Sequence, residues 1–166
     1  MTLDVTIGGY SADSFASLAE YTDRASAMGW TLVASTTTQE QNLRRACVAL
    51  NTMWLQKAYG FRQYKLQTLE FPRLYMPLVK GWQILPDTIP QDIKNAQMEL
   101  AYLIQNGADP LATLTATISE KTVKAGPVES TTKYLGGLGI PQFRVVSLIL
   151  RPYLQSSDGQ AMMARA

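Results

Sequence analysis

Aromatic and basic side chains alternate between positions 59 and 82 of this 166-residue chain, and this pattern is the one most able to do chemistry. Its members are Tyr59, Arg62, Tyr64, Lys65, Phe71, Arg73, Tyr75, Lys80 and Trp82. Rings that stack on unpaired bases, beside cations that contact phosphates, are used by proteins that bind single-stranded nucleic acid. The formal net charge is only +2, however, whereas a dedicated binder is usually strongly basic. We therefore favour protein contact for this segment and keep single-stranded DNA binding as the alternative.

Charge is also segregated along the chain. Residues 61–81 contain four cations and one acidic residue, a net of +3, whereas residues 82–110 contain one cation and four acidic residues, a net of −3. Opposite patches suit a head-to-tail contact between copies, although two solvated faces of a monomer would carry the same charges. The predicted subunit interface comprises Arg62, Lys65, Phe71, Arg73, Lys80, Trp82, Asp87 and Glu99.

The sequence contains few of the residue combinations that enzymes use for catalysis. The chain has no histidine, which excludes His-based triads and His-ligated metals, and its one cysteine is Cys47. No Gly-Lys-Ser/Thr sequence follows the glycines of residues 136–139, and no calcium-binding loop is present. We expect no catalytic activity, no cofactor and no metal.

Three helices are predicted from apolar residues at steps of three and four. The first covers residues 11–28, capped by Ser11 or Ser14 and stopped by Gly29. The second begins at Thr38 and ends at Gly60, with Cys47 packed inside its apolar stripe. The third follows residues 87–90 and ends at Gly107. The predicted fold class is mainly α: a small helical bundle with a long irregular excursion, short extended segments and a C-terminal helix and tail.

The excursion covers residues 61–86, where helical periodicity fails and three prolines and a glycine occur. We expect short extended pieces near residues 66–71 and 75–81. A connection of this length in a compact domain is more often functional than idle. We therefore predict that partners contact the protein here.

Residues beyond the third helix are less regular. Residues 111–124 could form a strand or a poor helix, and residues 123–134 are predicted to be extended. The predicted organisation is a helical domain at residues 1–135, followed by a linker, a C-terminal helix and a tail at residues 136–166. We expect the tail beyond residue 155 to order only on a partner.

The C-terminal helix could have either of two roles. Its short apolar face, flanked by arginines, could dock in a groove of a partner, or it could complete the core of the bundle. The predicted docking residues are Phe143, Arg144, Val146, Ile149, Leu150, Arg151 and Tyr153.

An ordered set of short sequence matches resembles the phage head-to-tail adaptor (connector) family, including its branch labelled DnaT-like single-stranded-DNA-binding proteins. The matching pieces are Tyr21 with Trp30, Leu43-Arg44-Arg45-Ala46, Tyr59-Gly60, Leu69-Glu70-Phe71-Pro72-Arg73, Ile89-Pro90, Ala96, Glu99-Leu100-Ala101 and Gly126-Pro127-Val128 before Tyr134. They cover residues 10–135. The insertion after Arg73 and the C-terminal region depart from the family pattern.

The resemblance implies a viral structural protein without catalysis, located in the head-tail neck of a tailed bacteriophage virion and assembled in the host cytoplasm. Its subunits would form a dodecameric ring under the portal protein and extend the DNA channel. The other partners would be a stopper or tail-terminator protein, and genomic DNA that passes through the lumen without sequence-specific binding. The sequence also predicts no secretory signal and no membrane contact, because no apolar stretch is long enough to span a bilayer.

Overall fold

A computed structural model describes residues 2–112, 120–125, 128–133 and 143–155. The chain divides into two compact units, one formed by residues up to 108 together with those from 143 onward, and the other by residues 109–142. The predicted boundary between residues 135 and 136 falls inside the second unit. The fold is mainly α, which confirms the predicted class.

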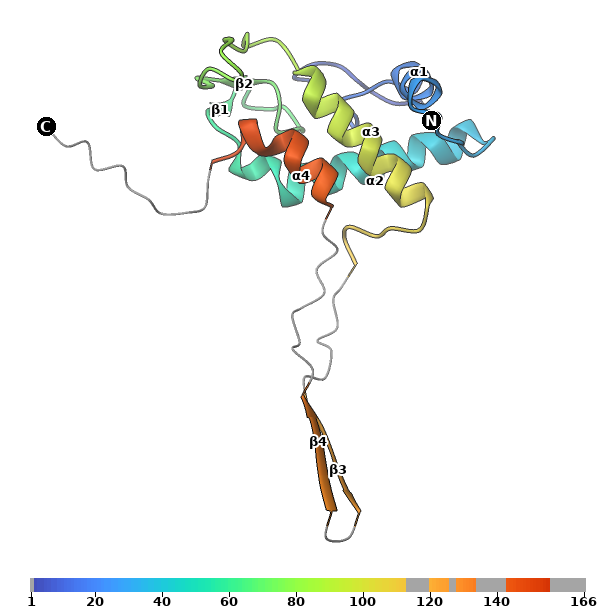
Figure 1. The fold of residues 1–166 in the computed structure, drawn as a ribbon. Helices are drawn as coiled ribbons and strands as arrows, with labels where there is room; N and C mark the ends of the chain where they lie inside the picture. Colours follow the sequence, from blue (N-terminus) through green and yellow to red (C-terminus); the bar gives the residue numbers. More distant parts are fainter. Residues whose placement is uncertain (1, 113–119, 126–127, 134–142, 156–166) are drawn as a thin grey trace, which may run out of the picture. The chain divides into compact units, whose positions relative to one another are not determined.

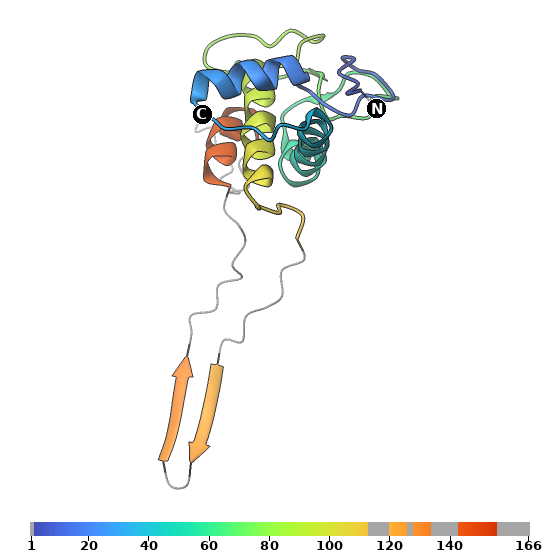
Figure 2. The ribbon, with the colours of Figure 1, turned by 90° about the vertical axis from the view of Figure 1, so that its right-hand side faces the viewer.

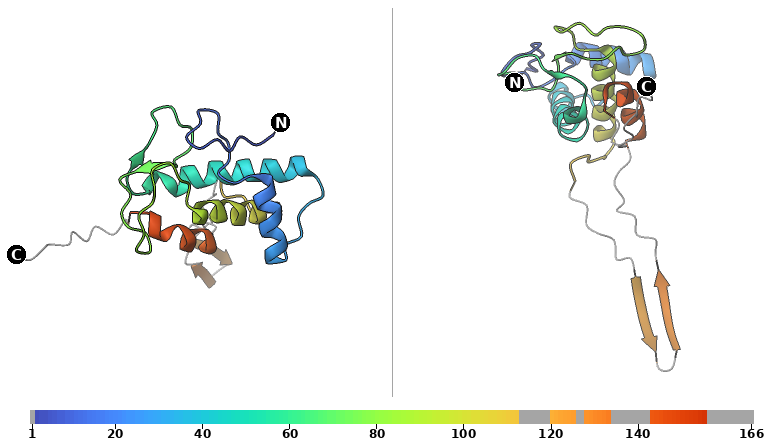
Figure 3. Two further views of the ribbon diagram at one scale, coloured as in Figure 1. Left: turned by 90° about the horizontal axis from the view of Figure 1, so that it is seen from above. Right: turned by 90° about the vertical axis from the view of Figure 1, so that its left-hand side faces the viewer.

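Four helices build the first unit: α1 (Leu18–Met28), α2 (Thr36–Met53), α3 (Gln91–Gln105) and α4 (Arg144–Leu150) (Figure 1). The middle helix is α3, which packs against both α2 and α4. Viewed from above, α1 runs across one end of α2 and α3 (Figure 3). The core lies between these helices and the long connection from α2 to α3.

Helix α1 starts later than the sequence predicted. Its N-cap is Ser17, whose side chain accepts a hydrogen bond from the Glu20 backbone while the Glu20 carboxylate accepts one from the Ser17 backbone, forming a capping box. The predicted cap Ser14 instead donates its hydroxyl to the Ala16 carbonyl at 2.6 Å. The predicted stop is confirmed, because Gly29 takes the left-handed conformation with φ 68°.

The N-cap of helix α2 lies three residues before the predicted cap Thr38, and the helix ends at Met53 rather than at Gly60. Ser35 is its N-cap, with a side chain that accepts from the Thr38 backbone at 3.3 Å. The apolar stripe is buried as expected, and Cys47 is only 1% exposed. Burial raises the pKa of the Cys47 thiol to about 12, so the thiol is protonated and packed at neutral pH.

The C-terminal helix α4 belongs to the core of the first unit. Four predicted docking residues are buried there: Phe143, Val146, Leu150 and Tyr153. Phe143 meets Trp54 edge-on, with ring centroids 6.1 Å apart, and Tyr153 meets Phe71 in the same way at 6.4 Å. The docking interpretation is therefore wrong for these four side chains, because they pack inward. Ile149 is half-buried, and Arg144 and Arg151 are exposed.

The second unit contains an antiparallel hairpin of β3 (Glu120–Ala125) and β4 (Val128–Lys133). Its register pairs Ala125 with Val128 at the turn and Glu120 with Lys133 at the open end. The extended structure predicted from residue 123 is thus confirmed for the strand residues. The predicted linker glycines and the tail beyond residue 155 lie outside the described residues. In the described part of the chain, no helix is long and apolar enough to cross a membrane.

Candidate nucleic-acid interface

Residues 54–90 connect α2 to α3 and contain the aromatic and basic pattern. The connection includes a 3-10 turn, η1 (Leu55–Lys57), and the two short paired strands β1 (Phe61–Arg62) and β2 (Arg73–Leu74). Both strands lie outside the extended pieces predicted for residues 66–71 and 75–81; the first of these contains no strand, and the second contains only one end of an isolated antiparallel bridge from Val79 to Trp82. The predicted irregularity of the remainder is confirmed.

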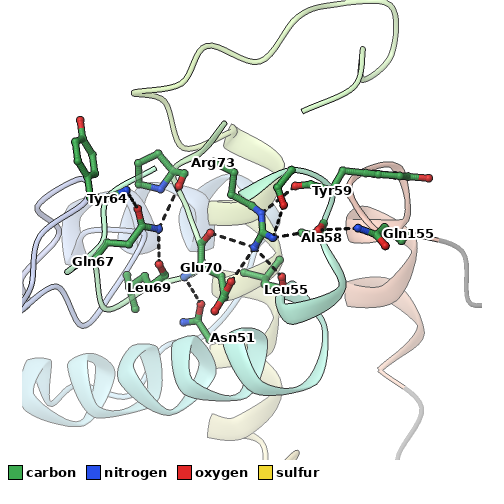
Figure 4. A network of polar contacts seen from close by, with 12 residues as sticks. Asn51, Leu55, Ala58, Tyr59, Tyr64, Gln67, Leu69, Glu70, Arg73 and Gln155 are labelled. Carbon is green, nitrogen blue, oxygen red and sulfur yellow. Dashed lines mark hydrogen bonds and ion pairs between the residues drawn. The ribbon is translucent and has the colours of Figure 1, made fainter. Parts of the chain in front are cut away.

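A buried guanidinium, that of Arg73, anchors this connection (Figure 4). Its nitrogens donate to the backbone carbonyls of Leu55 (3.2 Å), Ala58 (3.1 Å), Tyr59 (2.9 Å), Gly60 (2.9 Å) and Glu70 (3.4 Å). They also pair with the Glu70 carboxylate at 2.7 Å. The prediction that Arg73 faces an acidic residue of a neighbouring copy is wrong, because the buried Arg73 side chain makes its hydrogen bonds within its own chain.

Two side-chain amides, of the buried Gln67 and the half-buried Asn51, hold the backbone between residues 64 and 72 (Figure 4). The side-chain nitrogen of Gln67 donates to the carbonyls of Leu69 and Pro72 at 2.7 and 3.1 Å, and its oxygen accepts from the Tyr64 backbone at 2.9 Å. Asn51 of α2 accepts from the Glu70 backbone at 2.9 Å. Arg73, Gln67 and Asn51 thus hold the backbone of residues 64–73 in place.

The outward side chains are large and apolar. Phe61, Tyr75 and Trp82 are 71%, 84% and 80% exposed, and Leu66 and Leu78 are also exposed. Tyr75 has a φ of 56°, which is unusual for a residue other than glycine. Residues with such backbone angles cluster at functional sites. Solvent-exposed aromatic groups of this number on one connection indicate an interaction surface. Phe71 is the exception, because it is 1% exposed and belongs to the core.

Exposed cations accompany these rings. Arg62, Lys65 and Lys57 are exposed. Within the described residues, the side chains of Arg62 and Lys65 make no hydrogen bond and no ion pair. Lys80 pairs with Asp92 but remains 62% exposed. Three or four exposed positive groups therefore lie on the connection that carries the rings.

The acidic half of the predicted subunit interface is used internally. Asp87 accepts hydrogen bonds from the Tyr64 hydroxyl at 2.7 Å and from the Gln63 amide. The bond from Tyr64 lowers the pKa of Asp87, and the same bond raises the pKa of Tyr64. Glu99 pairs with Arg24 at 2.9 Å. Both acidic residues therefore have partners inside the chain, and the Lys80–Asp92 pair joins the two charged stretches within one copy, which weakens the charge argument for head-to-tail assembly.

The sequence reasoning missed a contribution from the N-terminus. The backbone of Thr68 donates to the Gly9 carbonyl at 3.2 Å, and its hydroxyl donates to the Tyr10 carbonyl. Tyr10 is 82% exposed. No local pattern could have indicated this, because the two segments are 58 positions apart.

The described residues contain no group of three potential metal ligands among His, Cys, Asp and Glu. The site consists of exposed rings and cations on a fixed backbone. Such an arrangement can bind a partner through stacking and phosphate contacts.

The entire chain, residues 1–166, matches the family described as "Putative DnaT-like ssDNA binding protein", and the chain belongs to this family. No curated protein and no solved structure matches it.

The family match corrects the functional interpretation of the sequence. The resemblance to phage head-to-tail adaptors was wrong as the main identification, because the family that covers the chain is the DnaT-like one and no adaptor family is shown. The predicted function in the head-tail neck and the predicted class of viral structural protein are therefore wrong as well. The alternative interpretation, a single-stranded-DNA binder using residues 59–82, is the one that the match favours. Ring assembly and the absence of catalysis stay predictions.

Proposed function

We propose that this protein binds single-stranded DNA through the exposed aromatic and basic side chains of residues 59–82. The observation that carries the proposal is the set of three aromatic side chains, Phe61, Tyr75 and Trp82, that are at least 71% exposed on a connection held by buried polar contacts. The family description names the same ligand.

The rings supply sequence-tolerant affinity. Stacking of a base on an aromatic side chain contributes about 1–3 kcal/mol per base. Arg73 and Gln67 hold the backbone of residues 55–73, and Val79 and Trp82 exchange two backbone hydrogen bonds. Less conformational entropy is therefore lost on binding than in a loop that orders around its ligand. A duplex offers no free base faces along its length, so the same rings favour single strands.

The cations supply the phosphate contacts. Arg62 and Lys65 have no side-chain partner within the described chain, so contact with a phosphate breaks no bond to the protein. Each phosphate contact on a single strand contributes a slope of about −0.7 in the logarithm of affinity against the logarithm of salt. With about three contacts the slope is roughly −2, which is modest and consistent with a net charge of +2.

Alanine substitutions of the exposed rings test this site. We expect Tyr75→Ala and Trp82→Ala each to weaken binding of a fluorescein-labelled oligothymidylate by roughly 5- to 150-fold, measured by fluorescence anisotropy. Both side chains are at least 80% exposed, so the fold should not change, which circular dichroism verifies. Leu148→Ala, at a 55% exposed position on α4, is the matched control and should bind as the wild type does. Unchanged affinity in all three variants would contradict the proposal.

A further inference from the structure

The N-terminal segment forms a closed loop between residues 4 and 13. Its ends are joined by two hydrogen bonds: the Asp4 amide donates to the Asp13 carboxylate at 2.8 Å, and the Asp13 amide donates to the Asp4 carbonyl at 2.9 Å. The Asp4 carboxylate accepts from the Thr6 amide and the Ser11 hydroxyl, and hydrogen bonds from the Thr6 side chain, the Ser11 hydroxyl and the Thr6 amide lower its pKa to about 2. The Asp13 carboxylate also pairs with Arg44 of α2 at 2.6 Å. The loop is therefore closed on itself and tied to the helical unit.

This loop lies against the connection that carries the proposed site, and the two segments run side by side (Figures 2 and 3). Beyond the Thr68 hydrogen bonds, the contact depends on Gly8. A β-carbon at Gly8 would lie 2.4 Å from a ring carbon of Tyr64, and its φ of +70° is a conformation that favours glycine. The Tyr64 ring thus occupies the space that a side chain at Gly8 would need.

The outward side chains of the loop are largely apolar and bury little of their surface against the rest of the protein. Tyr10 is 82% exposed, Ile7 48% and Val5 37%. Within the described part of the chain, the Tyr10 hydroxyl has no hydrogen-bond partner. The phenol ring consequently contributes almost nothing to stability, although the backbone beside it is fixed by Thr68.

We propose that Tyr10 is a further base-stacking residue, so that the single-stranded DNA site spans two separate segments of the chain. This inference rests on the proposed function. The loop that carries Tyr10 packs through Gly8 against another exposed ring, Tyr64, whose hydroxyl donates to Asp87. Lys65 follows Tyr64 in the chain and is exposed, so this part of the surface also offers a cation for phosphate. A strand that stacks on Tyr75 and Trp82 gains this extra contact only if it is long enough.

The experiment compares oligothymidylates of increasing length, from about 4 to about 16 nucleotides, by fluorescence anisotropy. We expect the wild-type affinity to rise with length, and Tyr10→Ala to lose roughly 5- to 150-fold on the longest strand and little on the shortest. Tyr10→Phe keeps the ring and should bind as the wild type does. Met28→Ala, at a 52% exposed position at the end of α1, is the control and should also be unchanged.

A second variant moves the loop while keeping the tyrosine. Gly8→Ala places a methyl group against the Tyr64 ring, so the loop must shift, and we expect the same length-dependent loss as in Tyr10→Ala. If the wild type binds and Tyr75→Ala loses affinity, but Tyr10→Ala loses none at any strand length, this inference is overturned and the proposed function stays intact. Equal losses in Tyr10→Phe and Tyr10→Ala would overturn stacking as the cause. A wild-type protein that binds no strand would overturn both proposals.

Discussion

The buried guanidinium of Arg73 determines the shape of the candidate site at the scale of single residues. The end of a helix leaves carbonyl oxygens without partners inside the helix, and a cation there is favoured by the helix dipole. Arg73 satisfies the carbonyls around the end of α2 and η1 while it also pairs with Glu70. Its planar group can donate several hydrogen bonds in fixed directions, which a lysine cannot do.

Replacement of Arg73 should therefore reduce stability strongly. We expect Arg73→Ala to lower the free energy of unfolding by about 3–5 kcal/mol, because several buried carbonyls and a carboxylate lose their donor. Arg73→Lys should lose less, about 1–3 kcal/mol, because it keeps the charge but fewer hydrogen bonds. Urea unfolding monitored by tryptophan fluorescence measures both. Arg62→Ala, at an exposed position on the paired strand, should change stability by less than about 0.5 kcal/mol. A wild-type unfolding curve for Arg73→Ala would disprove the anchoring role.

The chemistry of this residue could not be predicted from the sequence. The alternation of rings and cations around Arg73 is visible locally, and it led to the alternative function that the family match favours. The acceptors of the guanidinium, however, lie between 3 and 18 positions earlier in the chain, and a charged residue in a loop is usually exposed. The contact of Gly8 with Tyr64 is invisible in the sequence for the same reason.

Among the secondary-structure elements, the helices were predictable because their apolar stripes repeat at the helical period. Helix starts were harder, because serines 11, 14 and 17 all precede α1 and each could act as a cap. Only Ser17 has a glutamate three residues later, and that reciprocal pair determined the start. The role of α4 stayed open because an apolar face on a short helix suits a core as well as a groove.

Adjacent valines on α4 separate these two roles. Val146 is fully buried and Val145 is 53% exposed. We expect Val146→Asp to destabilise the protein by at least about 3 kcal/mol, because an unpaired charge is placed in the core. Val145→Asp introduces the same group at the surface and should change stability by less than about 0.5 kcal/mol. Thermal unfolding measures both. Equal stability of the two variants would mean that α4 does not belong to the core.

At the scale of the whole molecule, the charge distribution suits a moderate binder rather than a strongly basic one. Acidic residues are paired with cations in contacts such as Arg24–Glu99, Lys94–Glu20 and Arg44–Asp13, all within the helical unit. The cations of the connection are thereby left as the available positive groups near exposed rings. Binding should consequently depend more on stacking than on net charge.

The most direct test of single-stranded DNA binding is a comparison of single and double strands across salt. Wild-type protein is titrated against a labelled oligothymidylate and against a duplex of equal length by fluorescence anisotropy. We predict tighter binding of the single strand at every salt concentration, with a logarithmic salt slope of roughly −2. The slope should become less negative by about 0.7 in Arg62→Ala. Equal affinity for both forms, or no binding of the single strand at low salt, would contradict the account.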